Sequence, residues 1–523
     1  MFKEFEIHEF GSSECREALR RSALPFGGNL GPINRTFDQL RRLPLACKTV
    51  MFEHGYVDED YQDEFSAFYS KAFKTYDQRC VRLHFFSYRI PTRTRTGFAK
   101  YRKHYLGFMV IRPTDLQRMG RTILRPPIAD PDREFMHCGA PFRAHILGER
   151  FEITAMPFIQ QDTQVGACAQ ASLWMVARYM SHRFGHREFL PAEINQLAKA
   201  KNAMGRAYPA EFGLLWTQML DALDGMGFFA WSYSLGGLAA CSKHIEAAFP
   251  INAGASKATK RKQLLVQCSA KLADIAYRYI ESGLPVILGT ANHALVGIGH
   301  TYDPASQATV AIQRIPEFIV HNDAEGPYGC MPLFGQPPDC VPFSDVDSII
   351  AVVPKEVTLR GEEAEAMARK AVEELLGQPT QNATAPTLLD LLKHHRSDLG
   401  SALDHREHRT FLMSSTEFQA QLREDMKAGR FHKKIGDQLL RLDYPRFIWI
   451  SEISSSTLLN HPQRNQRKCL GRVIIDSTAP ANTEGQMVLH FCDLLHIRDR
   501  QGSAEDIRGV FPHSTPFGHK IVR

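Results

Sequence analysis

The strongest helical pattern of apolar residues in the chain begins near Cys168 and follows a polar turn rich in glutamine, at the end of a strand. Apolar side chains recur at the i, i+3, i+4 and i+7 spacing of one helix face, at Leu173, Val176, Ala177 and Met180. Trp174 and Met175 lie between them and extend the apolar surface. A helix that is apolar on nearly every face is buried. The segment 156–180 therefore predicts a core helix whose N-terminus carries Cys168 to a surface.

Short apolar and alternating runs before this segment indicate a mixed, strand-rich N-terminal domain over residues 1–150. Prolines separate runs that predict strands at 81–90, 105–111 and 121–124. The first 75 residues are more polar, and they predict short helices at 13–21 and 61–73. A further strand is expected at 151–158.

Residues 151–355 mix helices with strands and are expected to form a second domain. Helices are predicted at 210–226 and 262–282, followed by a buried strand at 286–288. The next predicted strand, 292–300, has His293 near its start and two glycines that let another backbone approach closely. The strand after it, 318–321, ends at Asn322 and Asp323.

The remaining residues, 356–523, are expected to form a third domain that is helical first and strand-containing later. An amphipathic helix is predicted at 361–376, and a linker rich in Pro, Thr and Asn near 378–387. Strands are predicted at 447–453, 472–476 and 487–491. The whole pattern predicts an α+β protein of three domains.

Composition narrows the function classes only slightly. The chain of 523 residues is too long for a single core, and its net charge of +6 is a weak bias that does not argue for nucleic acid. No apolar run approaches the length of a membrane span, and the first residues show no secretory signal. Eleven cysteines without CxxC pairs favour a reduced, cytoplasmic setting and argue against a structural zinc site.

Three predicted elements together offer the parts of a cysteine nucleophile site. Cys168 lies at a helix start, where the dipole favours the thiolate, the nucleophilic form of the side chain. His293 begins a strand and can hold the thiol proton, and Asn322 or Asp323 at the end of the next strand can orient the imidazole. Antiparallel neighbours can bring those two strand ends together.

An oxyanion hole has two candidate side chains upstream of the cysteine. Gln161 follows the apolar strand that ends near Phe158, and Gln164 lies nearer to Cys168. Either amide, with the backbone N–H of Cys168, could donate to the developing oxyanion.

Residues 151–355 resemble the papain-like cysteine peptidase superfamily. Three stretches carry the resemblance: Gln161 to Met175, His293 to Gly299 and Phe318 to Asn322. The closest similarity is to its bacterial, C39-like branch of bacteriocin-processing type. The resemblance implies a papain-like fold with a Cys-led buried helix and an antiparallel sheet. It implies a bacterial, cytoplasmic thiol protease that hydrolyses a peptide or isopeptide bond.

Carried over by position, the resemblance gives each candidate residue a role. Cys168 is the nucleophile and His293 the general acid and base. Asn322 matches the orienting residue, with Asp323 as its rival, and Gln161 matches the oxyanion glutamine, with Gln164 as its rival. The sequence departs from the branch after the cysteine, where Ala169 and Gln170 stand in place of Gly-Pro, and in its longer gap from the histidine to Asn322. No cofactor and no metal are implied.

Other chemistry-bearing residues are interpreted as structural. His300, His321 and Cys138 are taken as packing residues, and the histidines at 394, 395, 405 and 408 as a solvated helical face, because their spacing lacks a zinc motif. The basic, aromatic segment 93–103 is interpreted as a solvated loop, because no nucleic-acid-binding motif accompanies it.

The expected partners are a protein or peptide substrate and a regulatory protein, without nucleic acid or membrane. Two other functions remain open at this level. The same residues could serve a deamidase or a transglutaminase-like acyltransferase, because one thioester intermediate serves all three reactions. Alternatively, the chain is an inactive scaffold that binds nucleic acid through its basic segments, with salt-dependent affinity.

Overall fold

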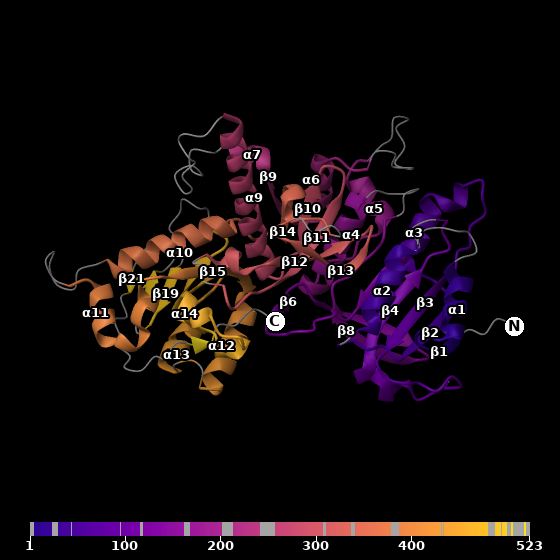
Figure 1. Cartoon of the computed structure of the whole chain (residues 1–523), viewed down its shortest axis with the longest axis horizontal. Coiled ribbons are helices and arrows are strands. Elements are labelled where there is room, and N and C mark those ends of the chain that lie inside the picture. The colour runs from indigo at the N-terminus through magenta and orange to yellow at the C-terminus, as the bar shows by residue number, and fades with distance from the viewer. Residues whose placement is uncertain are drawn as a thin grey trace.

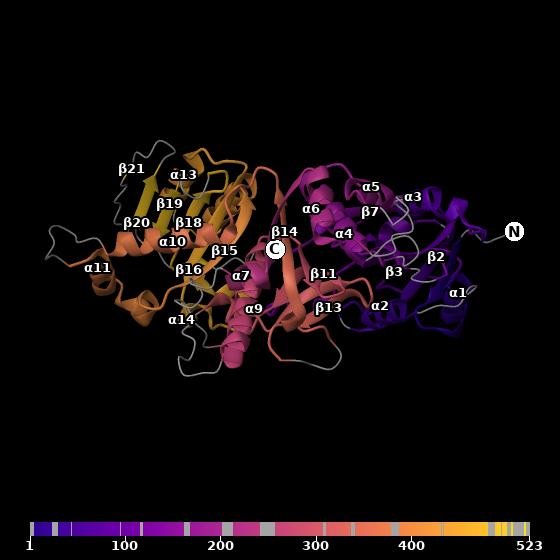
Figure 2. The same ribbon diagram turned by 90° about the horizontal axis from the view of Figure 1, so that it is seen from above.

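A computed structural model of the chain describes most of its 523 residues. The described residues are 5–23, 30–42, 44–94, 96–115, 119–161, 168–200, 213–240, 257–306, 310–335, 340–377, 386–429, 431, 433–479, 487–492, 494–498, 504–505 and 517–518. Three large antiparallel sheets follow one another along the molecule, each with its own helices, and the described residues also form two two-stranded sheets (Figures 1 and 2). The chain is therefore an α+β protein, as expected.

The N-terminal sheet has the strand order β1-β2-β3-β4-β5. Its strands are β1 (Phe5–Glu9), β2 (Thr49–Tyr56), β3 (Cys80–Phe86), β4 (Tyr105–Ile111) and β5 (Met119–Leu124). Its helices are α1 (Ser13–Ala23), α2 (Gly31–Arg41) and α3 (Glu59–Ala67), with 3-10 turns at Tyr69–Lys71 and Phe98–His104. The three strands and the first helix predicted in this region are confirmed. The helix predicted at 61–73 is observed as α3 and the 3-10 turn that follows it. β1, β2 and α2 were not predicted.

Adjacent aromatic residues of β3 give this sheet two covered faces. Phe85 packs edge-on against Phe37 of α2, with ring centroids 5.7 Å apart. Phe86 points to the opposite face, as alternate strand residues do, and meets Phe151 at 5.9 Å. Phe151 lies in the hairpin of β7 (Ala140–Ile146) and β8 (Glu149–Ala155). Helices thus cover one face, and this hairpin covers the other.

The central sheet has the order β13-β12-β11-β10-β14-β9, and β6 adds to β11. Its strands are β6 (Glu134–Met136), β9 (Phe228–Ser234), β10 (Val286–Thr290), β11 (Ala294–Thr301), β12 (Glu317–Asn322), β13 (Gly326–Pro332) and β14 (Val346–Pro354). Its helices are α4 (Cys168–Phe184), α5 (Pro191–Leu197), α6 (Trp216–Gly225), α7 (Leu235–Ala240) and α9 (Lys257–Glu281), and 3-10 turns lie at Ala311–Arg314 and Phe343–Asp345. The predicted helix 262–282 and the strands predicted at 286–288 and 318–321 are confirmed. The strand predicted at 292–300 begins at Ala294, so His293 precedes it instead of starting it. The helix predicted at 210–226 begins at Trp216, and the first three residues of the predicted range lie outside the described residues.

Of the two glycines predicted to let another backbone approach closely, Gly299 does so in β11, whereas a side chain lies closest to Gly297. A Cβ atom on Gly299 would lie 2.4 Å from the carbonyl oxygen of Phe135, where β6 crosses the strand. A Cβ on Gly297 would lie 3.0 Å from the side chain of Ile280 in α9. Because β6 precedes residue 151, a segment of the first 150 residues completes the central sheet.

The C-terminal sheet has the order β15-β16-β18-β19-β20-β21. Its strands are β15 (Glu407–Ser414), β16 (Phe447–Ser454), β18 (Gly471–Asp476), β19 (Met487–Phe491), β20 (Leu494–Arg498) and β21 (Ala504–Glu505), and β17 (Lys468–Cys469) pairs with β22 (Phe517–Gly518). Helices are α10 (Gly361–Leu376), α11 (Leu388–His395), α12 (Ser415–Lys427), α13 (Lys433–Arg441) and α14 (Ser456–Leu459), with 3-10 turns at Ser397–Leu403 and Arg464–Gln466. Residues 378–385 of the predicted linker lie outside the described residues.

Buried polar contacts join the central and C-terminal sheets. The hydroxyl of Ser282, just after α9, accepts from the backbone N–H of Leu412 in β15 at 2.7 Å. Arg278 of α9 donates to Glu365 of α10 at 2.7 Å, with both side chains less than a tenth exposed. Among the described helices, none combines the length and apolar character required to cross a lipid bilayer.

Candidate active site

Cys168 is the first residue of α4, a helix whose body is buried almost throughout. The helix is fixed at several points along its length. The indole N–H of Trp174 and the guanidinium of Arg178 both donate to Asp60 of α3, at 2.9 Å and 2.6 Å. The hydroxyl of Tyr179 donates to the carbonyl of Gly283 at 2.6 Å. The predicted core helix is confirmed, and Cys168 itself is only half-buried at its N-terminus.

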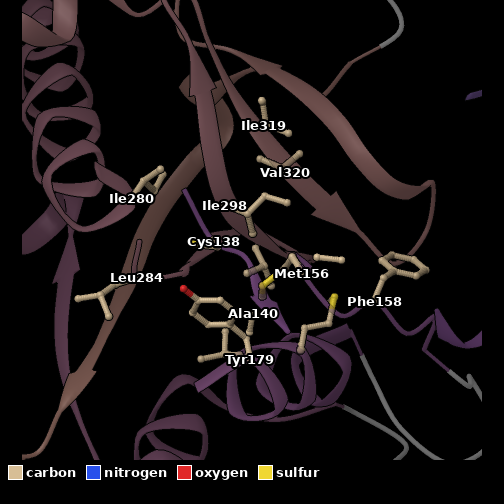
Figure 3. Packing of buried hydrophobic residues seen from close by; sticks show 14 of the residues in the cluster. Cys138, Ala140, Met156, Phe158, Tyr179, Ile280, Leu284, Ile298, Ile319 and Val320 are labelled. Atoms are coloured by element: carbon tan, nitrogen blue, oxygen red, sulfur yellow. The ribbon is translucent and has the colours of Figure 1, made fainter. Parts of the chain in front are cut away.

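An apolar layer lies beneath the site, between α4 and the central sheet. Figure 3 shows Tyr179 of α4 close to Met156, to Cys138 and to Ile298, the last of which belongs to β11. Each of these side chains is fully buried. Their packing sets how far α4 lies from the strand that begins next to His293.

His293 occupies the turn between β10 and β11. The backbone N–H of Thr290 donates to the carbonyl of His293 at 2.8 Å, which closes a tight hairpin. Ala294, the next residue, pairs with Gly289 and starts β11. The imidazole is therefore held by a short turn between two core strands, where its backbone has little freedom.

The end of β12 brings two polar side chains to the same imidazole. Val296 of β11 pairs with His321 of β12, so the start of β11 lies beside the end of β12. The Nε2 atom of His293 is 2.8 Å from Oδ1 of Asn322 and 3.4 Å from Oδ1 of Asp323. The Asn322 oxygen can only accept, so His293 carries a proton on Nε2.

A hydrogen bond also joins the His293 side chain to Cys168. The imidazole therefore has the thiol as one partner and the Asn322 amide as another. The sequence left Asn322 and Asp323 as rivals, and the structure brings both within reach of one nitrogen. Asn322 is the closer, and its Oδ1 atom is itself fixed by the N–H of Ala324 at 3.0 Å.

The charges of this group favour an imidazolium. Burial acts to lower the pKa of His293, but the hydrogen bond with Cys168, the charge of Asp323 and the hydrogen bond with Asn322 raise it to about 9. Burial raises the pKa of Asp323 to about 6, against the opposing effects of His293 and of backbone N–H groups, including that of Gln161. At neutral pH the pair is therefore mainly imidazolium and carboxylate.

Gln161 reaches the site by way of the N-terminal sheet. Phe158 forms a β-bridge with Thr122 of β5, and the N–H of Gln160 donates to the carbonyl of Met119 at 2.9 Å. Gln161 follows directly and is half-buried, and its backbone N–H is among the groups that act to lower the pKa of Asp323. Its rival, Gln164, lies outside the described residues, as do all of 162–167.

One positioning residue was missed from the sequence. The hydroxyl of Ser172, one helical turn after Cys168, donates to the carbonyl of Ala294 at 3.3 Å. This bond ties the cysteine helix to the residue that follows His293. The available signal was a polar residue four positions after the cysteine, on a helix that is otherwise apolar.

His300, His321 and Cys138, which were interpreted as structural from the sequence, are all buried. Burial lowers the pKa of His321 to about 3, and its ring packs between Phe158 and Tyr328. Cys138 is fully buried, and burial raises its pKa. His300 lies at the far end of β11, against His137 and Glu281.

Two expectations about surface segments need correction or refinement. The four C-terminal histidines do not share a solvated helical face, because His408 lies buried in β15 and donates or accepts at Ser451. In the basic segment, Phe98 and Tyr101 are core side chains, and Arg102 pairs with Glu149. The aromatic residues of that segment are thus not available for stacking on nucleic-acid bases.

Comparisons with known proteins add no further information on this chain. No family model, no curated protein and no solved structure matches it.

Proposed function

We propose that the chain is a papain-like, C39-like cysteine peptidase in which Cys168 attacks the carbonyl carbon of a peptide or isopeptide bond. The observation that carries this proposal is the hydrogen-bonded series of Cys168, His293 and Asn322, with Asp323 behind the imidazole. A thiol next to an imidazole whose pKa is about 9 can transfer its proton and persist as an ion pair at neutral pH.

The proposed reaction uses Cys168 as the nucleophile, His293 for proton transfer, and two N–H donors for the oxyanion. The Cys168 sulfur adds to the carbonyl, and the oxyanion is stabilised by the backbone N–H of Cys168 and the Gln161 amide. The His293 imidazolium gives its proton to the leaving amine as the C–N bond breaks, which leaves a thioester. His293 then takes a proton from water, which attacks the thioester and releases the acid.

The identity of the leaving group separates hydrolysis of a peptide from the alternative reactions. A mixture of unlabelled peptides, incubated with the protein and read by mass spectrometry, reports cleavage as new termini. Deamidation of glutamine appears as a mass increase of about 1 Da without cleavage, and acyl transfer as a cross-linked product. We expect new termini that disappear in Cys168→Ala and remain in Cys330→Ala.

Cys330 is a suitable control because it is a solvent-exposed cysteine of β13, which belongs to the same sheet as β11 and β12. Cleavage that persists in Cys168→Ala, or that is lost equally in both variants, contradicts the proposal. If the proposal holds, we expect the flanking sheets to regulate access to the site or to recruit a protein substrate. Assays of the full-length chain with protein substrates test this role.

A further inference from the structure

Three ligand-type side chains converge at a second buried point, away from Cys168. Nε2 of His137 lies 3.1 Å from Nε2 of His300 and 3.1 Å from Oε2 of Glu281. Nε2 of His300 lies 3.4 Å from Oε1 of Glu281. All three side chains are at most 2 % exposed. Within the described part of the chain, no other three such groups meet this closely.

The three residues come from separate segments of the fold. His137 follows β6, Glu281 is the last residue of α9, and His300 lies in β11. The N–H of Cys138 donates to the carbonyl of Ile298 at 3.0 Å, so the segment of His137 continues along β11. Pairing of the strands and the end of the helix thus fix the three ligand groups independently.

The tautomer of His300 leaves its Nε2 atom free of a proton, so that this atom can bind a metal ion but cannot donate a hydrogen bond. Its Nδ1 atom lies 2.9 Å from the carbonyl oxygen of Thr301, which can only accept, so Nδ1 carries the proton. In the neutral ring, Nε2 then presents a lone pair to His137 and Glu281. A histidine that binds a metal commonly donates its other N–H to a backbone carbonyl in this way.

Hydrogen bonds alone satisfy this arrangement poorly. A single N–H of His137 points toward one acceptor, yet His300 and Glu281 both lie 3.1 Å from the same nitrogen. A cation at the centre would attract all three atoms at once. With zinc-to-ligand bonds near 2.0–2.1 Å, neighbouring ligand atoms of a tetrahedral site lie about 3.3 Å apart. The three separations bracket this value.

We propose that His137, Glu281 and His300 bind a divalent transition-metal ion, with zinc as the preferred ion. Two imidazoles and one carboxylate are a ligand set that zinc uses in proteins, with water as the fourth ligand. The sequence did not imply a metal, because these residues are 144 and 19 positions apart in a chain without a zinc motif.

The surroundings of Glu281 orient its carboxylate and balance the charge. Oε1 of Glu281 accepts from the Tyr277 hydroxyl at 3.0 Å and from Arg409 of β15 at 2.9 Å. Arg409 would repel a metal ion, but it also pairs with Glu452 at 2.7 Å, and that carboxylate offsets its charge. These contacts are the outer partners that commonly hold a ligating carboxylate.

The ion would join β6, α9 and β11 at the point where β15 of the C-terminal sheet reaches them. Such a site is closed to substrate, and it stabilises the folded state because the ion binds that state in preference to the unfolded chain. It is independent of the proposed peptidase activity, because none of its ligands contacts Cys168 or His293 in the described structure.

The test uses full-length protein in a Cys168→Ser background, which removes the reactive thiol as a competing ligand. We expect elemental analysis to find about one zinc per chain after dialysis, in line with one three-ligand site. Replacement by cobalt(II) should give the visible absorption bands of a four-coordinate ion. This spectrum is read with the cluster intact, so it does not depend on any variant folding.

Two variants and a matched control assign the site. His300→Gln and His137→Gln should lose the metal and the cobalt bands. A chelator should lower the melting temperature of the parent protein and of the control variant, but not that of these two variants. His84→Gln is the control, because His84 is an equally buried imidazole beside Glu53 and Arg82, without a second histidine. Absence of bound zinc together with absence of cobalt bands in the parent protein overturns the proposal. Equal metal content in the His300→Gln and His84→Gln proteins also overturns it.

Discussion

Ser172 and Ala294 are joined by a hydrogen bond of 3.3 Å from the serine hydroxyl to the alanine carbonyl. Ser172 lies one helical turn after Cys168, and Ala294 directly follows His293. This contact links the two elements that carry the thiol and the imidazole without touching either group. The separation of Cys168 from His293 therefore depends on a side chain that takes no part in the proposed chemistry.

Replacing Ser172 by alanine should reduce turnover while leaving the fold intact. Loss of the hydroxyl lets α4 and β11 shift, and small misplacements at a reacting pair lower the rate, here by about 10-fold. We expect kcat to fall more than KM changes, as measured on a cleaved peptide. Ser181→Ala is the matched control, because Ser181 is a buried serine of the same helix that donates to Ala177 and Arg187 instead.

Cys168 should react with iodoacetamide faster than the other cysteines at mildly acidic pH. The proposed mechanism pairs the Cys168 sulfur with the His293 imidazolium, which favours reaction at this thiol. Partial burial of the thiol and the nearby Glu317 raise the pKa of Cys330 to about 12. Mass spectrometry of digests after short labelling gives the rate at each cysteine. His293→Ala should remove the difference. Equal labelling of both thiols in the unmodified protein would count against the ion pair.

Asp323→Asn should make the protein more stable and shift its activity to lower pH. The Asp323 pKa of about 6 exceeds its ordinary value, so ionisation costs stability as pH rises from about 3.8 to 6. Asparagine avoids that cost, up to about 3 kcal/mol at neutral pH. Loss of the carboxylate also lowers the pKa of His293. The alkaline limb of the pH–rate profile should therefore shift to lower pH.

Asn322→Ala gives the contrasting result if Asn322 orients the imidazole. It removes the 2.8 Å bond to His293 and no buried charge, so turnover should fall without a gain in stability. Urea denaturation and peptide turnover of both variants, measured side by side, identify the third residue. Asp323 has that role if its variant loses more activity than Asn322→Ala at the optimum pH of each variant.

His293 should stabilise the protein at neutral pH and lose this effect in alkali. Its folded pKa of about 9 lies above the unfolded value near 6.5, so the contribution is complete below about 6.5 and disappears as pH rises to 9. The free energy of unfolding of the parent should exceed that of His293→Gln by up to about 3 kcal/mol at pH 6, and the gap should close by pH 9.5.

His321→Gln serves as the control for that experiment. The pKa of His321 is lowered to about 3 by burial, so this ring stays neutral across the whole window and its loss should be independent of pH there. A gap between parent and His293→Gln that stays constant from neutral to alkaline pH would argue against a protonated imidazole.

Local patterns predicted much of the fold because they depend on neighbouring residues. The apolar spacing of α4 and the glycines of β11 were visible in the sequence, and so were Cys168, His293 and Asn322 as members of one constellation. β2 was missed because its buried residues, such as Val50 and Phe52, are followed by the polar Glu53, His54 and Gly55. The junction of His137, Glu281 and His300 depends on long-range packing, which no local spacing records.

The β-bridge between Phe158 and Thr122 adds residues 158–160 to the edge of the N-terminal sheet. The hydrogen bond from the backbone N–H of Gln160 to the carbonyl of Met119 extends this pairing to the residue next to Gln161. A shortened protein starting at residue 151 would leave those groups without partners. We therefore expect the N-terminal sheet to help position Gln161 in the proposed active site. A molecule that binds this sheet should alter the proposed activity by moving a single strand.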